Sequence, residues 1–126
     1  MKKDILVIDD DPDLLKLVKY SLELDGYGVT TAVDGLGGLA IAQTERPDLI
    51  LLDVTMEPTD GLQVLKQLRE CPETRDITVM MLSAKRLVRQ VDCAFGIGAD
   101  DYITKPFDVD RLSEIIHRKL KALSKK

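Results

Sequence analysis

Three short runs of consecutive apolar residues constrain the fold of this chain more than any other feature of its sequence. They are residues 5–8 (ILVI), 49–52 (LILL) and 79–82 (VMML). Successive side chains of a strand point to opposite faces of its sheet, so a strand without polar alternation must be covered on both faces. Two weaker runs, 28–33 and 102–104, complete the series. The pattern predicts five strands, three of them buried between layers of helices.

Helical patterns separate these runs. Asp11-Pro12 combines a capping carboxylate with a proline suited to the first helical turn, and Gly26 marks the end of that helix. The next helix, 36–45, contains Gly37 and Gly38. Each glycine costs about 1 kcal/mol relative to alanine, so we expect this helix to be short or mobile. Three further helices are predicted: one that begins at 60–61, one over 86–95 and one over 109–120.

A strand followed by a helix, repeated five times, predicts an α/β fold with a doubly wound, five-stranded parallel sheet, (βα)5. Right-handed crossovers leave few arrangements of the strands, and the flavodoxin-like order 2-1-3-4-5 is favoured. The length fits a single domain over residues 1–126, with its core at about 4–121 and a short basic tail at 122–126.

Composition limits the location and the partners. No apolar run reaches the roughly 18 residues that a membrane span needs, and residues 1–3 lead directly into a strand-like run without the features of a secretory leader. The net charge of −4 argues against a nucleic-acid surface. Cys71 and Cys93 lack a CxxC spacing and indicate reduced thiols, and His117 is interpreted as a solvated helix residue. We therefore expect a cytoplasmic protein with no membrane partner and no direct nucleic-acid partner.

Polar side chains follow four of the five predicted strands. Asp9 and Asp10 come after the first strand and Asp53 after the third, while Ser83 and Lys105 come after the fourth and fifth. In an open parallel sheet, ligands bind in the crevice beyond the carboxyl ends of the strands. We therefore expect three carboxylates, one hydroxyl and one ammonium group to converge at one edge of the sheet.

This set of groups indicates phosphoryl chemistry at a metal site. Crowded carboxylates raise one another's pKa unless a cation neutralises them, and a cluster of hard oxygen ligands suits Mg²⁺. An aspartate can attack phosphorus to give an aspartyl phosphate, with a metal and a lysine to offset the charge. The alternative interpretation of Asp9 and Asp10 is that both are solvated loop residues without a metal. The alternative for Asp11 is that it serves only as the helix cap. A calcium loop that starts at Asp9 is excluded, because its sixth and twelfth positions are Leu14 and Tyr20.

Five short motifs occur in a characteristic order. They are VIDD at 7–10, LLDVTM at 51–56, DG at 60–61, SA at 83–84 and KPF at 105–107. In this order and spacing they resemble the receiver domains of bacterial two-component response regulators, over about residues 4–120. The resemblance implies a phosphorylation-dependent signalling switch, which catalyses only its own phosphoryl transfer and dephosphorylation and is not otherwise an enzyme.

The resemblance also implies roles for the acidic residues. Asp53 matches the phosphoacceptor, phosphorylated from a histidine of a kinase or a histidine phosphotransfer protein. Asp10 and Asp53 match the side-chain ligands of Mg²⁺, and Thr55 matches the residue that adds a backbone carbonyl. Asp9 matches the acid that helps to hold the metal, usually through water.

Four more residues match the family's switch. Lys105 pairs with the carboxylate or the phosphoryl group, and its bond to Pro106 is expected to be cis. Ser83 moves towards the phosphoryl group, and the aromatic side chain of Tyr102 rotates inward when it does. The helix at 86–95, the strand at 102–104 and the helix at 109–120 would form the surface for a downstream protein, in a monomer or a weak dimer.

Departures from the family pattern and rival functions remain. Glu57 stands where most receivers have proline, with Pro58 and Thr59 after it. The extra carboxylate can alter metal affinity or hydrolysis of the phosphoryl group. Lys85 resembles a position that tunes phosphoryl lifetime.

A phosphohydrolase of the haloacid dehalogenase type usually has a second aspartate where Thr55 stands, and it needs a cap domain that this length excludes. A binding module that has lost phosphorylation is disfavoured, because all the site residues are present.

Overall fold

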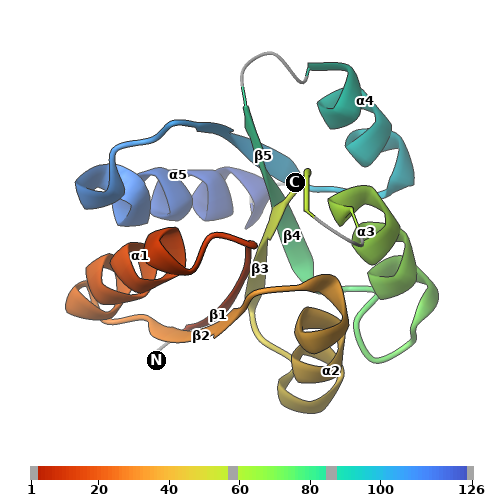
Figure 1. The fold of residues 1–126 in the computed structure, drawn as a ribbon, viewed down its shortest axis with the longest axis horizontal. Helices are drawn as coiled ribbons and strands as arrows, with labels where there is room; N and C mark the ends of the chain where they lie inside the picture. Colours follow the sequence, from red (N-terminus) through yellow and green to blue (C-terminus); the bar gives the residue numbers. More distant parts are fainter. Residues whose placement is uncertain (1–2, 57–59, 85–87, 125–126) are drawn as a thin grey trace.

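The computed structural model describes residues 3–56, 60–84 and 88–124. Five strands form one sheet in which every described pair is parallel, in the order β2-β1-β3-β4-β5 (Figure 1). The strands are β1 (Asp4–Ile8), β2 (Gly28–Ala32), β3 (Leu49–Asp53), β4 (Thr78–Ala84) and β5 (Asp101–Lys105). The predicted doubly wound, flavodoxin-like sheet is therefore confirmed.

Helices cover both faces of this sheet, as the unbroken apolar runs require. They are α1 (Pro12–Leu24), α2 (Gly35–Glu45), α3 (Gly61–Glu70), α4 (Val88–Ile97) and α5 (Leu112–Ser124), the last preceded by a 3-10 turn, η2 (Val109–Arg111). Helices α1 and α5 pack on one face, and α2, α3 and α4 pack on the other (Figure 1). Each layer has its own apolar core, and the β3 residues 49–52 between the two cores are completely buried.

Aspartates begin the helices where the sequence predicted helix starts. The Asp11 carboxylate accepts hydrogen bonds from the backbone N–H groups of Asp13 and Leu14, at 3.1 and 3.2 Å. Asp60 caps α3 in the same way. Gly26 follows α1 with φ of +93°, a left-handed conformation that favours glycine. No helix in the described ranges has the length and apolar character needed to cross a membrane.

The expectation that the helix with two glycines is short was wrong. Helix α2 runs for 11 residues, which is close to the ordinary length of a helix. Gly38 is buried against strand β1, and a Cβ at this position would overlap the side chain of Ile8. The glycine is therefore required by the close approach of helix to sheet, and its weak helix propensity is outweighed by the packing that it allows.

Other boundaries moved by a few residues. Helix α4 ends at Ile97 instead of at residue 95, and the last predicted helix begins with a 3-10 turn. The predicted strands were also too short at their ends. Asp53 and Lys105 are the last residues of their strands and Ser83 is the last but one, whereas the sequence placed all three after the strands. Residues 57–59 and 85–87 lie outside the described part of the chain, so the expectations about Glu57, Pro58, Thr59 and Lys85 stay predictions.

Arg69 ties the carboxyl end of α3 to three neighbouring segments. Its Nε donates to the carbonyl oxygen of Gly98 at 3.0 Å, and one terminal nitrogen donates to those of Arg75 and Ile77 at 2.9 and 2.8 Å. The other terminal nitrogen pairs with Asp100 at 3.1 Å. The planar guanidinium holds the start of β4, the end of α4 and the start of β5 together, which fixes the half of the sheet that bears Ser83 and Lys105.

Candidate functional site

The predicted site residues lie together at the carboxyl edge of the sheet. Asp53 and Lys105 are the last residues of β3 and β5, Asp9 follows β1 directly, and Ser83 is the penultimate residue of β4. The parallel register aligns these strand ends, because Asp53 is opposite Leu82 in β4. Side chains that are as many as 96 residues apart in the chain thus meet at one edge.

Three carboxylates form an acidic cluster at this edge, consisting of Asp9, Asp10 and Asp53. One oxygen from each lies within 4.8 Å of the others. Asp9 and Asp53 are 1% and 4% exposed, whereas Asp10 is exposed, so the cluster opens to solvent on one side. Backbone N–H groups fix the two buried carboxylates: Asp11 donates to Asp9 at 3.0 Å and Thr55 donates to Asp53 at 3.2 Å.

The Lys105 ammonium group bridges the two buried carboxylates. Its Nζ lies 2.7 Å from Asp9 Oδ2 and 3.4 Å from Asp53 Oδ2. The family resemblance predicted a pair with the phosphoacceptor, but the shorter contact is with Asp9. Because one ammonium group serves two carboxylates, and Asp10 adds a third, the cluster keeps an excess of negative charge.

Burial, and after it the charge of Asp9, raise the pKa of Asp53 to about 6, although Lys105 and the N–H of Thr55 oppose the rise. For Lys105, burial lowers the pKa, but the hydrogen bond to Asp9 and the charge of Asp53 outweigh it, so the net pKa is raised. Lys105 is therefore positively charged, and the ionised Asp53 carboxylate is only partly neutralised.

This set of donors fits a hard divalent cation. The ligands are carboxylate oxygens from rigid strand ends, they lie close enough to share an ion, and the exposed side leaves room for water. A divalent ion would also remove the repulsion that raises the pKa of Asp53. Thr55 lies next to the cluster through its N–H bond to Asp53, and the metal contact predicted for its carbonyl oxygen stays a prediction.

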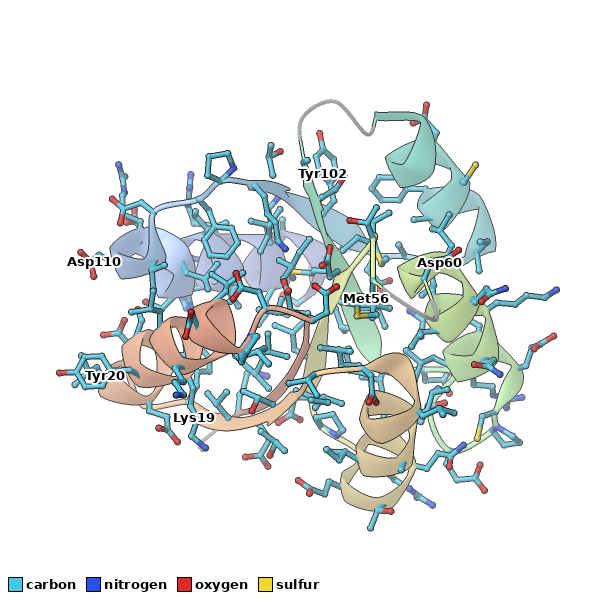
Figure 2. The ribbon with its side chains drawn as sticks, viewed as in Figure 1. Lys19, Tyr20, Met56, Asp60, Tyr102 and Asp110 are labelled. Atoms are coloured by element: carbon cyan, nitrogen blue, oxygen red, sulfur yellow. The ribbon has the colours of Figure 1, made fainter. Side chains whose placement is uncertain are left out.

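Gly61 has a role at the site that sequence reasoning missed. The sequence predicted a helix start and a family motif here, but not that a Cβ at this position would overlap the backbone carbonyl oxygen of Asp53. Its N–H donates to the carbonyl oxygen of Val54 at 2.8 Å. The absence of a side chain lets α3 begin against the end of β3. The Asp60-Gly61 pair (Figure 2 labels Asp60) was the available signal.

The two switch residues lie near the cluster without joining it. Ser83 is 2% exposed, and its hydroxyl donates to the carbonyl oxygen of Ala84 at 3.2 Å, not to a carboxylate. Tyr102 is 39% exposed and points away from the sheet towards α4, where its ring meets Phe95 edge to face (Figure 2). The peptide bond between Lys105 and Pro106 is cis, as expected.

Another groove lies at the opposite, amino edge of the sheet. It has a volume of about 650 Å³ and is lined by Tyr27, His117 and Leu120, among others. None of the predicted site residues lines it. His117 is exposed on α5 and is separate from the acidic cluster, in agreement with its interpretation as a solvated residue.

Comparisons with known proteins agree with this geometry. A family model described as the response regulator receiver domain matches residues 5–117. The DNA-binding dual master transcriptional regulator RpaA of Synechocystis is 47% identical over 108 residues, 86% of this chain and 45% of that protein. The alkaline phosphatase synthesis transcriptional regulatory protein PhoP of Bacillus subtilis is 47% identical over 109 residues, 85% of this chain and 44% of that protein. The chain thus spans about half the length of these curated relatives.

Solved structures show the same fold. The chemotaxis protein CheY4 of Vibrio cholerae aligns with a TM-score of 0.87 at 29% identity, covering 94% of this chain and 98% of that one. A CheY-like receiver domain protein from Methanospirillum hungatei aligns with a TM-score of 0.88 at 30% identity, covering 99% and 98%. In both comparisons the likeness extends over nearly the whole of each chain.

Proposed function

The chain belongs to the response regulator receiver domain family, the phosphorylation-dependent switches of two-component systems, and from that membership we propose that Asp53 is its phosphoacceptor. The phosphoryl group comes from a phosphohistidine of a kinase or a histidine phosphotransfer protein. One observation carries the proposal: Asp53 is a buried carboxylate, grouped with Asp9 and Asp10 and 3.4 Å from the Lys105 ammonium group.

The residues around Asp53 suit it to attack phosphorus. Its pKa of about 6 leaves the carboxylate ionised, and therefore nucleophilic, at neutral pH. The N–H of Thr55 orients one oxygen, and the other lies on the side of Lys105. As the new oxygen–phosphorus bond forms, the phosphorus–nitrogen bond of the donor breaks and the imidazole leaves with the electron pair. Lys105, held by Asp9 at 2.7 Å, needs only a short movement to meet a phosphoryl oxygen.

We propose that the metal ion is Mg²⁺, held by Asp10, Asp53 and the backbone carbonyl of Thr55. Asp9 helps to hold the ion through a water molecule. When bound, Mg²⁺ neutralises charge on the transferred phosphoryl oxygens. The all-oxygen donor set and the open side of the cluster support this choice over a softer metal.

Phosphorylation then changes a surface some distance from Asp53. A phosphoryl group adds nearly two negative charges and three acceptor oxygens. The hydroxyl of Ser83 exchanges its hydrogen bond with the Ala84 carbonyl for one with a phosphoryl oxygen, and the space that it leaves accepts the ring of Tyr102. The surface formed by α4, β5 and α5 thereby changes shape and binds a downstream protein.

Several further expectations about this chain belong to the same proposal. The single domain over 1–126 hydrolyses its own phosphoryl group, works in the cytoplasm and is a monomer or a weak dimer. The printed name of RpaA records DNA binding for that longer protein. The absence of direct nucleic-acid binding by this chain stays a prediction.

Phosphate incorporation tests the acceptor. The wild-type protein, incubated with acetyl phosphate and Mg²⁺, should gain the mass of one phosphoryl group, and Asp53→Asn should gain none. Asp76→Asn is the matched control, because its carboxylate is 94% exposed and distant from the cluster. EDTA should prevent labelling of the wild type. Labelling of Asp53→Asn to the wild-type level would remove Asp53 from its role.

A further inference from the structure

Lys119 on α5 makes two contacts on the surface that would report phosphorylation. Its Nζ lies 3.1 Å from Asp101 Oδ1 and 5.7 Å from the centroid of the Tyr102 ring. The side chains of Lys119 and Asp101 are only 29% and 26% exposed. Phe95 of α4 meets the same ring edge to face, at 6.1 Å between centroids and 84° between planes. The outward ring of Tyr102 is thus held between a cation and an aromatic side chain.

These two contacts of Lys119 depend differently on the conformation of Tyr102. The ion pair with Asp101 does not involve the tyrosine ring, so a turn of the ring about χ1 does not in itself break it. The cation–π contact exists only while the ring points outward, because an inward ring leaves the ammonium group facing solvent. A contact made in one of two states shifts the equilibrium towards that state. Lys119 therefore stabilises the outward state selectively, and Asp101 keeps it in the position to do so.

We propose that Lys119 is a positioning residue that holds Tyr102 in its outward rotamer, a role that we call the latch. In this way it sets how often the unphosphorylated chain adopts its active surface. The proposal rests on the function proposed above, in which Tyr102 turns inward after phosphorylation. The rival interpretation is that Lys119 only forms a partly exposed ion pair with Asp101. Such pairs contribute little on their own, and this one would be indifferent to the rotamer of Tyr102.

The size of the effect follows from the exposure of the contact. A cation–π interaction at a partly exposed site changes an equilibrium constant by about two- to fivefold. Loss of the latch should raise the ratio of inward to outward Tyr102 by this factor. Because the inward state is the one that the phosphorylated site favours, the affinity of the site for a phosphoryl mimic should rise by up to the same factor.

The first test measures the rotamer of Tyr102 in the unphosphorylated protein, by NMR scalar couplings about χ1. Lys119→Met keeps the aliphatic stem and removes the charge, Lys119→Arg keeps a cation, and Arg118→Met removes a neighbouring exposed charge as the matched control. Of these three variants, Lys119→Met alone should raise the inward population, by about two- to fivefold. Asp101→Asn, which frees the lysine, should change it in the same direction. Equal rotamer populations in Lys119→Met and Arg118→Met would overturn the proposal.

The second test measures binding of beryllofluoride with Mg²⁺, a mimic of the phosphoryl group. Lys119→Met should bind it about two- to fivefold more tightly than the wild type, and Arg118→Met should not. Unchanged binding, with a wild type that does bind, would overturn the latch. If Asp53→Asn binds the mimic as well as the wild type does, the proposed acceptor is wrong, and the rotamer measurement still decides the role of Lys119.

Discussion

Replacing Asp53 with asparagine should make the metal-free protein more stable at neutral pH, although it removes the proposed phosphoacceptor. The carboxylate is 4% exposed, and it shares a single ammonium group with Asp9. Asparagine has nearly the same shape, and its side-chain oxygen can still accept the hydrogen bond from the N–H of Thr55. The substitution therefore removes one buried negative charge from a cluster of three, while the packing is kept.

The size of the gain follows from the pKa of Asp53, which moves from its ordinary 3.8 to about 6 on folding. This rise means that ionised Asp53 opposes folding by up to ~3 kcal/mol. The pKa shift already includes the attraction of Lys105, but asparagine still buries an amide beside that ammonium group, so we expect a net gain of about 1–2 kcal/mol at pH 7.5. Below pH 3.8 the carboxyl group is protonated in both states, so the benefit of removing the charge grows between pH 3.8 and about 6.

Urea denaturation followed by circular dichroism, with EDTA present, measures this gain at pH 4 and pH 7.5. The difference in unfolding free energy between Asp53→Asn and the wild type should be about 1–2 kcal/mol at pH 7.5 and smaller by about 2 kcal/mol at pH 4, because only the wild type loses its buried charge on acidification. Saturating Mg²⁺ should stabilise the wild type and reduce the difference. A mutant that is less stable at pH 7.5, or a gain that is equal at both pH values, would refute the view that the cluster carries uncompensated charge.

Three further predictions concern the packing and the coupling of the site. Gly61→Ala should lower the free energy of unfolding by more than about 2 kcal/mol, because its methyl group would overlap a backbone carbonyl. Gly96→Ala, whose Cβ would have nothing within 4 Å, should raise the free energy of unfolding by about 0.5–1 kcal/mol. Urea denaturation of the two variants measures both changes. Arg69→Ala should cost ~2–3 kcal/mol through four lost hydrogen bonds, and a loss below 0.5 kcal/mol, which is the usual size of an effect at the surface, would contradict this. Lys105→Ala should fold and accept phosphate, but leave the NMR signals of Tyr102 unchanged on phosphorylation; wild-type shifts would show that the lysine does not couple the two.

The sequence predicted the sheet and the meeting of the site residues for one physical reason. Parallel strands end at a common edge, so Asp9, Asp53 and Lys105 had to converge once the apolar runs were recognised as strands. The preference of Lys105 for Asp9 could not be predicted, because it depends on side-chain positions that the strand pattern leaves open. The error about Gly38 arose because helix propensity describes an isolated helix, and the contact with Ile8 belongs to the folded chain.

The boundaries of the fourth helix were less accurate for a related reason. Gly96 directly follows the predicted end of this helix, but the helix continues through it to Ile97, and Gly98, with φ of +132°, comes after its last residue. The role of Gly61 was missed because a close approach between two backbones leaves no mark in the sequence other than the glycine itself.

The ion pair between Lys105 and Asp9 also bears on the order in which the acidic cluster is assembled during synthesis. The two residues are 96 positions apart, and the lysine ends the last of the five described strands in chain order. A nascent chain already carries its carboxylates while their ammonium partner has yet to be translated. The repulsion between Asp9 and Asp53 is therefore partly offset only after Lys105 has been synthesised, so the charges of the acidic cluster are arranged at a late step in the folding of the described chain.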